Sequence, residues 1–147
     1  MFITVHSASG AYIGRLVHDP VLAFLIGIIS HFVLDFIPHD DSKLTKPNEL
    51  RLKLFFIGLI DGLIAVLCLF MLRSRIDLFS LSIMAGVAGT IIPDIPWLIY
   101  KLFSVKCLEG YYNFHKIFHR KKINIKYWQG VTIQIIFLSI LTYLIIK

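Results

Sequence analysis

The sequence predicts an all-α, polytopic membrane helix bundle that forms a single integral-membrane domain over residues 1–147, with about four spans plus a short N-terminal helix. Two observations lead to this prediction. Hydrophobic residues make up 57% of the chain and charged residues 16%, whereas soluble domains average about 45–50% and about 25%. The apolar residues also gather in runs close to the ~20 residues that a helix needs to cross a bilayer. Disorder and a disulfide scaffold are excluded by this composition.

The first apolar segment, Phe2–Val17, is short and rich in small residues. No basic residue precedes it and no clear cleavage site follows, so it does not resemble a secretory signal. We expect a re-entrant or short packed helix, which a membrane tolerates only where protein covers it. Asp19 and Pro20 are predicted to cap the next helix. Hydropathy then predicts four spans, at Pro20–Ile37, Lys53–Leu72, Leu78–Tyr100 and Gly130–Ile146.

Lysine and arginine counts predict the orientation of these spans. The loops 38–53 and 101–129 share one side and carry eleven basic residues, against four on the other side. By the positive-inside rule the richer side is cytoplasmic, which predicts a multi-pass protein of the bacterial cytoplasmic membrane. The second loop is also aromatic, so we expect a helix near the membrane interface there. Because the basic residues lie between apolar runs, we interpret them as setting the membrane orientation. We expect no nucleic-acid partner.

Four ionisable side chains lie inside the apolar runs, where a charge costs about 2.5–3.5 kcal/mol and indicates function. With a rise of 1.5 Å per residue, three of them lie about 9–12 Å below the cytoplasmic ends of their spans. The loops add histidines at the same face. The residues that should therefore converge are His31, Asp35, Asp61 and Asp94 in the spans, with His39, His115 and His119 beside them.

The spacing of these residues suits a metal ion. His31 and Asp35 are one helical turn apart, as are His115 and His119, and histidines at i and i+4 can hold one ion. Imidazole with carboxylate suits zinc, with manganese or iron as alternatives. Taken alone, the first pair also fits a structural hydrogen bond and the second an interfacial position. Asp61 could be a ligand, a residue that orients a ligand, or a general base.

Two motifs resemble those of the predicted membrane-bound metal-dependent hydrolases, a group of small bacterial integral-membrane proteins. The segment 30–39 (SHFVLDFIPH) resembles their SHxxxDxxPH-type signature, and 89–94 (GTIIPD) resembles their G-x-x-x-P-D element. An early histidine in a short first helix, here His6, is similar as well. Pro96 and Trp97 stand where that group commonly has a further Asp or His. The resemblance implies metal ligands at His6, His31, Asp35, Asp94, His115 and His119.

The leading hypothesis is a metal-dependent hydrolase that acts on a lipid or lipid-linked ester at the cytoplasmic face, with membrane lipids as its surroundings. In this hypothesis, Asp61 and His39 are the catalytic candidates. His39, like His115 and His119, would either complete the coordination of the metal or protonate the leaving group. A small ion- or proton-coupled transporter is the second hypothesis, and it requires polar residues in both halves of the membrane. A non-catalytic scaffold, in which the polar cluster only locks the bundle, is the third.

Overall fold

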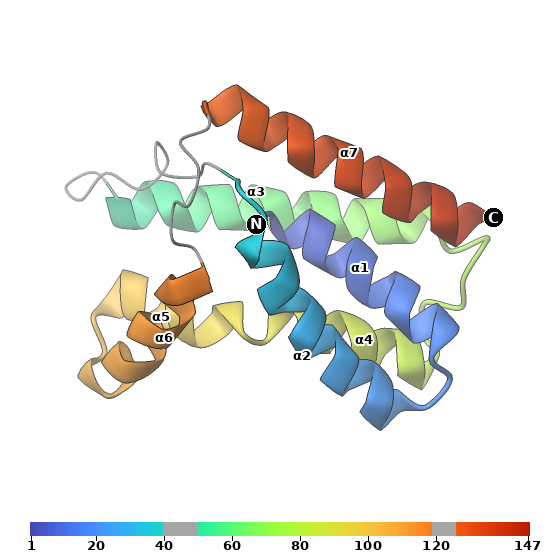
Figure 1. Cartoon of the computed structure of the whole chain (residues 1–147), viewed down its shortest axis with the longest axis horizontal. Coiled ribbons are helices and arrows are strands. Elements are labelled where there is room, and N and C mark those ends of the chain that lie inside the picture. Colours follow the sequence, from blue (N-terminus) through green and yellow to red (C-terminus); the bar gives the residue numbers. More distant parts are fainter. Residues whose placement is uncertain (40–49, 119–125) are drawn as a thin grey trace.

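The computed structural model describes residues 1–39, 50–118 and 126–147, and the regular elements in these ranges are all helices (Figure 1). The prediction of an all-α chain is therefore confirmed for this part of the protein. The helices are α1 (Ile3–Leu16), α2 (Pro20–Phe36), α3 (Leu50–Met71), α4 (Leu81–Ile91), α5 (Asp94–Phe103), the 3₁₀ turn η2 (Lys106–Leu108), α6 (Glu109–Phe118) and α7 (Tyr127–Ile146).

Two helices, α3 and α7, are long and apolar enough to cross a membrane. Such helices mark the chain as a membrane protein. Helices α4 and α5 would add a third span if they cross together, although they meet at an angle of 41°. The predicted span Leu78–Tyr100 is thus divided in two at Pro93, because proline lacks the N–H that would continue the helix. Helix α2 is apolar but has 17 residues, so the expected four-span bundle stays a prediction.

Helix α1 lies at the centre of the helices rather than at their edge. Nine of its 14 residues are buried, and it packs against α2, α3, α4 and α7. This placement agrees with the expectation of a short helix covered by protein, since few of its backbone and side-chain groups face outward. The cap of the following helix was also predicted correctly: the Asp19 side chain accepts the Leu22 N–H at 2.7 Å, with Pro20 at the first helical position.

Small residues bring α1, α2 and α4 into backbone contact. A Cβ added at Gly10 would lie 2.5 Å from the Val87 Cα, and one at Gly27 would lie 2.7 Å from the Gly86 carbonyl oxygen. Real Cβ atoms do not approach backbone so closely, so these positions accept only glycine without a shift of the helices. Close approach of this kind is how helices associate in membranes. It fixes the relative positions of the three helices that carry or support the polar cluster described below.

Helices α3, α4 and α7 run in two opposite directions. In Figure 1, α3 and α7 both begin on the left and end on the right, while α4 runs in the opposite direction. The Arg15 guanidinium donates to the Leu144 carbonyl at 3.0 Å and also to the Ile145 carbonyl, at the C-terminal end of α7. A cation at this end satisfies carbonyls that have no partner within the helix and complements the helix dipole. Arg15 therefore ties the end of α1 to the end of α7.

Candidate metal centre

Four side chains from three helices form a cluster that could hold a metal ion. His31 and Asp35 come from α2, Asp94 begins α5, and His115 lies on α6. One potential ligand atom from each residue lies within 4.8 Å of the others. Three of the side chains are buried, and that of Asp94 is 22% exposed. We call these four residues the His/Asp cluster.

The spacing of the cluster atoms is compatible with a single metal ion. The His31 Nε2 atom lies 3.0 Å from His115 Nε2 and 3.2 Å from Asp35 Oδ2. His115 Nε2 lies 3.4 Å from Asp94 Oδ1 and 3.7 Å from Asp35 Oδ2, and His31 Nε2 lies 3.8 Å from Asp94 Oδ1. Ligands 2.0–2.1 Å from a tetrahedral zinc ion are about 3.3 Å apart. These five separations, 3.0–3.8 Å, are near that value.

The orientation of His31 is fixed by the break between α4 and α5. The Thr90 carbonyl lies 2.8 Å from His31 Nδ1, and because a carbonyl can only accept, Nδ1 must carry the proton. In the neutral ring Nε2 then has the free lone pair, and this atom faces the cluster. Metal-binding histidines generally donate their second N–H to a carbonyl or carboxylate in this way.

The two oxygens of Asp35 face different neighbours. Its Oδ1 atom lies 2.6 Å from the Met1 nitrogen and 3.2 Å from His6 Nε2, both at the beginning of the chain. Its Oδ2 atom faces His31 and His115. The His6 ring also stacks on His31, with ring centroids 4.5 Å apart. The start of α1 thus orients a carboxylate and an imidazole of the cluster, which is how neighbouring groups position metal ligands.

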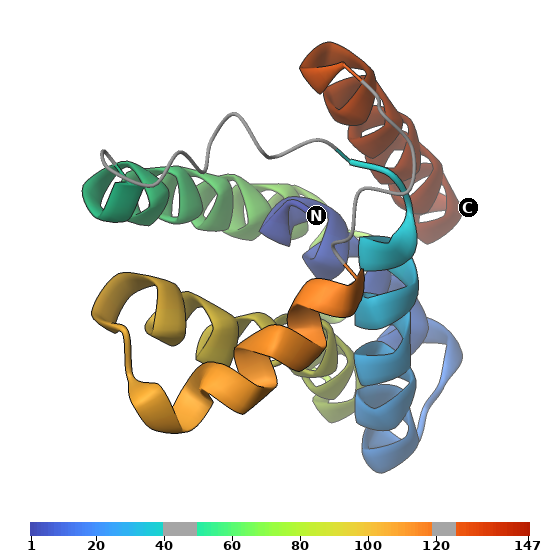
Figure 2. The same cartoon turned by 60° about the vertical axis from the view of Figure 1, so that its left-hand side comes forward.

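Helix α6 brings His115 to the cluster and is held there by aromatic side chains. Figure 2 shows α6 reaching from the α5 side toward the C-terminal end of α2. The Tyr111 hydroxyl donates to the Pro93 carbonyl at 2.6 Å, one turn before His115 on the same helix. Burial, followed by the negative charges of Asp94 and Asp35, raises the pKa of Tyr111. The phenol therefore stays protonated as a donor and joins α6 to the break at Pro93.

The predicted site residues differ in where the structure places them. His31, Asp35, Asp94 and His115 come together as expected. His6 contacts the cluster through Asp35 and His31 but is not one of its four members. His39 follows α2, and its Nδ1 atom donates to the Ile37 carbonyl at 2.8 Å. His119 lies outside the described residues.

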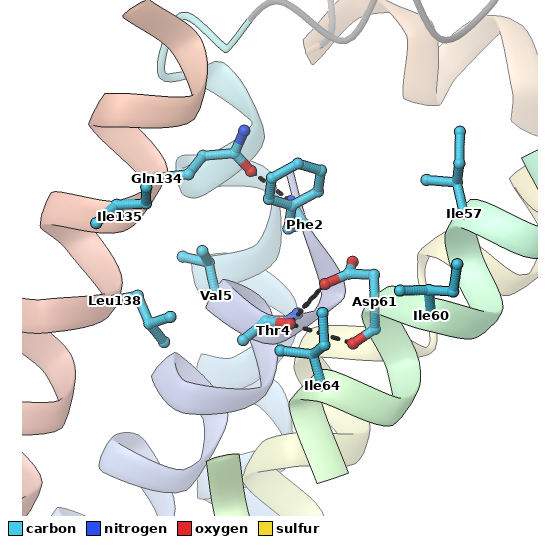
Figure 3. A pocket seen from close by; sticks show the side chains of 10 residues that line it. All are labelled: Phe2, Thr4, Val5, Ile57, Ile60, Asp61, Ile64, Gln134, Ile135 and Leu138. Carbon is cyan, nitrogen blue, oxygen red and sulfur yellow. Dashed lines mark hydrogen bonds between the residues drawn. The ribbon is translucent and has the colours of Figure 1, made fainter. Parts of the chain in front are cut away.

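Asp61, a predicted catalytic residue on α3, contacts the N-terminus of α1 and is not part of the cluster (Figure 3). Its carboxylate accepts the Ile3 N–H at 2.5 Å, the Thr4 hydroxyl at 2.5 Å and the Thr4 N–H at 3.3 Å. Gln134 of α7 accepts the Phe2 N–H at 2.7 Å. The first N–H groups of a helix have no partner within it, so side chains of α3 and α7 cap α1 from outside.

Replacing Asp61 with asparagine is expected to destabilise the protein without removing metal. The variant loses a charged acceptor at a helix N-terminus, which costs about 1–3 kcal/mol, or a fall in Tm of roughly 5–10 °C. Thermal unfolding in detergent and metal analysis would measure both properties, with the exposed Asp77→Asn as the control. Unchanged Tm with lost hydrolysis would instead support the predicted catalytic role of Asp61.

Sequence reasoning missed three groups: the Thr90 carbonyl and the Tyr111 hydroxyl, which support the cluster, and the Gln134 amide, which caps the start of α1. Thr90 lies within the quoted motif at 89–94, just before a proline that ends the helix, and the last carbonyls of a helix have no partner within it, so a free carbonyl was foreseeable there. Tyr111 precedes His115 by four residues and therefore shares its helix face. Nothing in the sequence indicates Gln134, because its partner is a backbone group of a distant segment.

The fold and cluster together define a helical membrane protein with a candidate metal centre. Comparison with known protein families, with curated proteins and with solved structures finds no match to this chain. The likeness to the predicted membrane-bound hydrolases therefore rests on the two motifs quoted above, and three of the four cluster residues lie in those motifs.

Proposed function

We propose that this protein is a zinc-dependent hydrolase of the bacterial cytoplasmic membrane that cleaves a phosphoester or acyl ester of a lipid or lipid-linked molecule. The observation that carries the proposal is the His/Asp cluster, whose two imidazole nitrogens and two carboxylate oxygens lie within 4.8 Å of one another. Such a mixed donor set favours zinc, with manganese and iron as alternatives. Catalytic zinc would activate water and polarise the oxygen of the scissile bond.

The roles of the residues follow from their positions. His31 and His115 offer neutral nitrogens, and Asp35 and Asp94 supply the negative charge that balances a divalent ion. Asp94 has the most exposed side chain of the four, at 22%, so a substrate would approach from its side. His6 and the Thr90 carbonyl keep Asp35 and His31 oriented.

In the hydrolysis, water adds its oxygen to phosphorus or to the acyl carbon while its proton goes to the departing oxygen.

The orientation in the membrane is part of the same proposal. We place four crossings, α2, α3, the bent pair α4–α5 and α7, with the loops 38–53 and 101–129 in the cytoplasm. The eleven basic residues of those loops support this orientation. So does the position of Arg15 at the C-terminal end of α7, since both lie on the side with few basic residues. The His/Asp cluster would then open toward the cytoplasmic leaflet.

Removal of metal tests the function. We expect about one zinc ion per chain in protein purified in detergent, and we expect chelation to lower hydrolysis of a phospholipid by at least about tenfold. Added zinc should restore the rate, whereas magnesium should not, because magnesium prefers oxygen ligands. Protein that takes up no metal after incubation with zinc, manganese or iron would support the scaffold hypothesis. Bound metal without hydrolysis of any lipid ester would leave the transporter hypothesis.

A further inference from the structure

A second feature of the molecule lies on the other side of the α1 N-terminus from the His/Asp cluster. It is a cavity of about 280 Å³ between the start of α1, the middle of α3 and the middle of α7 (Figure 3). The walls are mostly aliphatic. The lining includes Thr4 and Val5 of α1, Asp61 and Ile64 of α3, and Gln134 and Leu138 of α7.

The polar side chains of this cavity are already engaged. Asp61 accepts from Ile3 and Thr4, and Gln134 accepts from Phe2. They satisfy the backbone of α1 and leave an apolar surface toward the empty space. Apolar cavities of ~150 Å³ stay dry and bind small hydrocarbons. The space here is about 280 Å³ and open on one side, and its apolar lining suits several methylene groups better than a polar ligand.

The cavity also borders the lipid. Its two long walls are α3 and α7, the helices long and apolar enough to span a membrane. Both pack on α1 and not extensively on each other. Their remaining surfaces are apolar and exposed, as Leu63 (62% exposed) and Ile136 (50% exposed) illustrate. A hydrocarbon chain could therefore pass from the bilayer between α3 and α7 without crossing a polar surface.

The cavity and the His/Asp cluster are neighbours across one turn of α1. Thr4 and Val5 line the cavity, whereas His6 contacts Asp35 and His31. One turn of an α-helix rises about 5.4 Å, which is short compared with an acyl chain, so an amphiphilic molecule that passes around the N-terminus of α1 is long enough to reach both places. We infer that the cavity binds one acyl chain of a phospholipid whose ester group lies at the His/Asp cluster. The position of the ester group at the His/Asp cluster rests on the proposed function, whereas the binding of the acyl chain does not.

Filling the cavity tests the inference. Ile64→Trp places a large side chain in the cavity, and its matched control is Leu63→Trp, one position along the same helix and facing outward. Native mass spectrometry of detergent-purified protein with added phosphatidylglycerol would count the lipids retained per chain. We expect about one in the wild type and in the control, and at least about fivefold less in Ile64→Trp, since each buried methylene changes affinity about fourfold. Zinc content should be equal in all three proteins.

A second pair of variants covers the case in which Ile64→Trp does not fold. Leu138→Trp fills the cavity from α7, with the outward-facing Ile136→Trp as its control. Kinetics add an independent readout: replacing a butyryl ester by a dodecanoyl ester should lower KM at least about tenfold in the wild type. The two cavity variants should lose this dependence on chain length.

The outcomes separate this inference from the proposed function. Equal lipid retention in all variants would overturn the acyl-chain site, and zinc-dependent hydrolysis would still stand. Loss of lipid in the cavity variants, in a protein that hydrolyses nothing, would support the acyl-chain site and contradict the hydrolase. A protein that runs as a dimer in the wild type and as a monomer in Ile64→Trp would show that a second copy fills the cavity, which would also overturn the inference.

Discussion

Replacing Asp35 with asparagine is expected to reduce the zinc content of the purified protein from about one ion per chain to less than about a tenth. The Asp35 Oδ2 atom lies beside two imidazole nitrogens, 3.2 Å from His31 Nε2 and 3.7 Å from His115 Nε2. Asparagine keeps the shape of the side chain but removes its charge. Because even residues that only orient a ligand contribute about 10- to 100-fold to metal affinity, loss of a ligand should cost at least a hundredfold.

Elemental analysis after gel filtration in detergent would measure this effect, with zinc supplied in excess beforehand. Asp77→Asn is the matched control, because Asp77 is exposed and makes its hydrogen bond to the nearby Phe79 N–H. The control should keep the full zinc content. Stoichiometric zinc in a folded Asp35→Asn protein would show that the His/Asp cluster is not the metal site.

Replacing Gly86 with alanine is expected to destabilise the protein strongly, because the neighbouring helix leaves no room for the added methyl group. A Cβ at this position would collide with the carbonyl oxygen of Gly10 and lie 3.1 Å from the Gly14 nitrogen. Both are backbone atoms of α1, so neither can rotate away, and the helices themselves must separate. Overpacking of a tight interior costs about 1–3 kcal/mol and sometimes more, which corresponds to a fall in Tm of about 10 °C.

Thermal unfolding in detergent would measure the effect against Gly62→Ala. A Cβ at Gly62 on α3 meets nothing within 4 Å, so there alanine should be neutral or raise stability by up to about 1 kcal/mol through its higher helix propensity. Equal Tm values for the two variants would contradict the close contact of α1 with α4. The comparison isolates packing, because both changes are glycine to alanine within a helix.

Much of the His/Asp cluster could be predicted from local sequence. The i,i+4 spacing places His31 and Asp35 on one face of a helix, and the prolines after Thr90 predict a break beside Asp94. The rise per residue predicts equal depths for side chains on different helices. These properties depend on residues close together in the chain, which is why they are readable without a structure.

Asp61 shows why depth alone was insufficient. The rise per residue predicted that it would join the other acidic residues, yet its carboxylate meets the backbone of Ile3 and Thr4. The depth of a residue in the membrane does not determine which face of the helix it occupies or which helix packs against that face. The same limit explains the missed role of Gln134, whose partner is the Phe2 N–H of a segment 132 positions away.

Hydropathy and helical period by themselves determined that the chain is helical, that it belongs with membrane proteins, and which polar residues are costly to bury. The tertiary structure decided which of those residues meet. Three helices approach to backbone contact at glycines such as Gly10 and Gly86, and this approach turns α1 so that His6 faces Asp35 while Val5 faces the cavity. Such choices depend on contacts between distant segments, and no local pattern in the sequence encodes them.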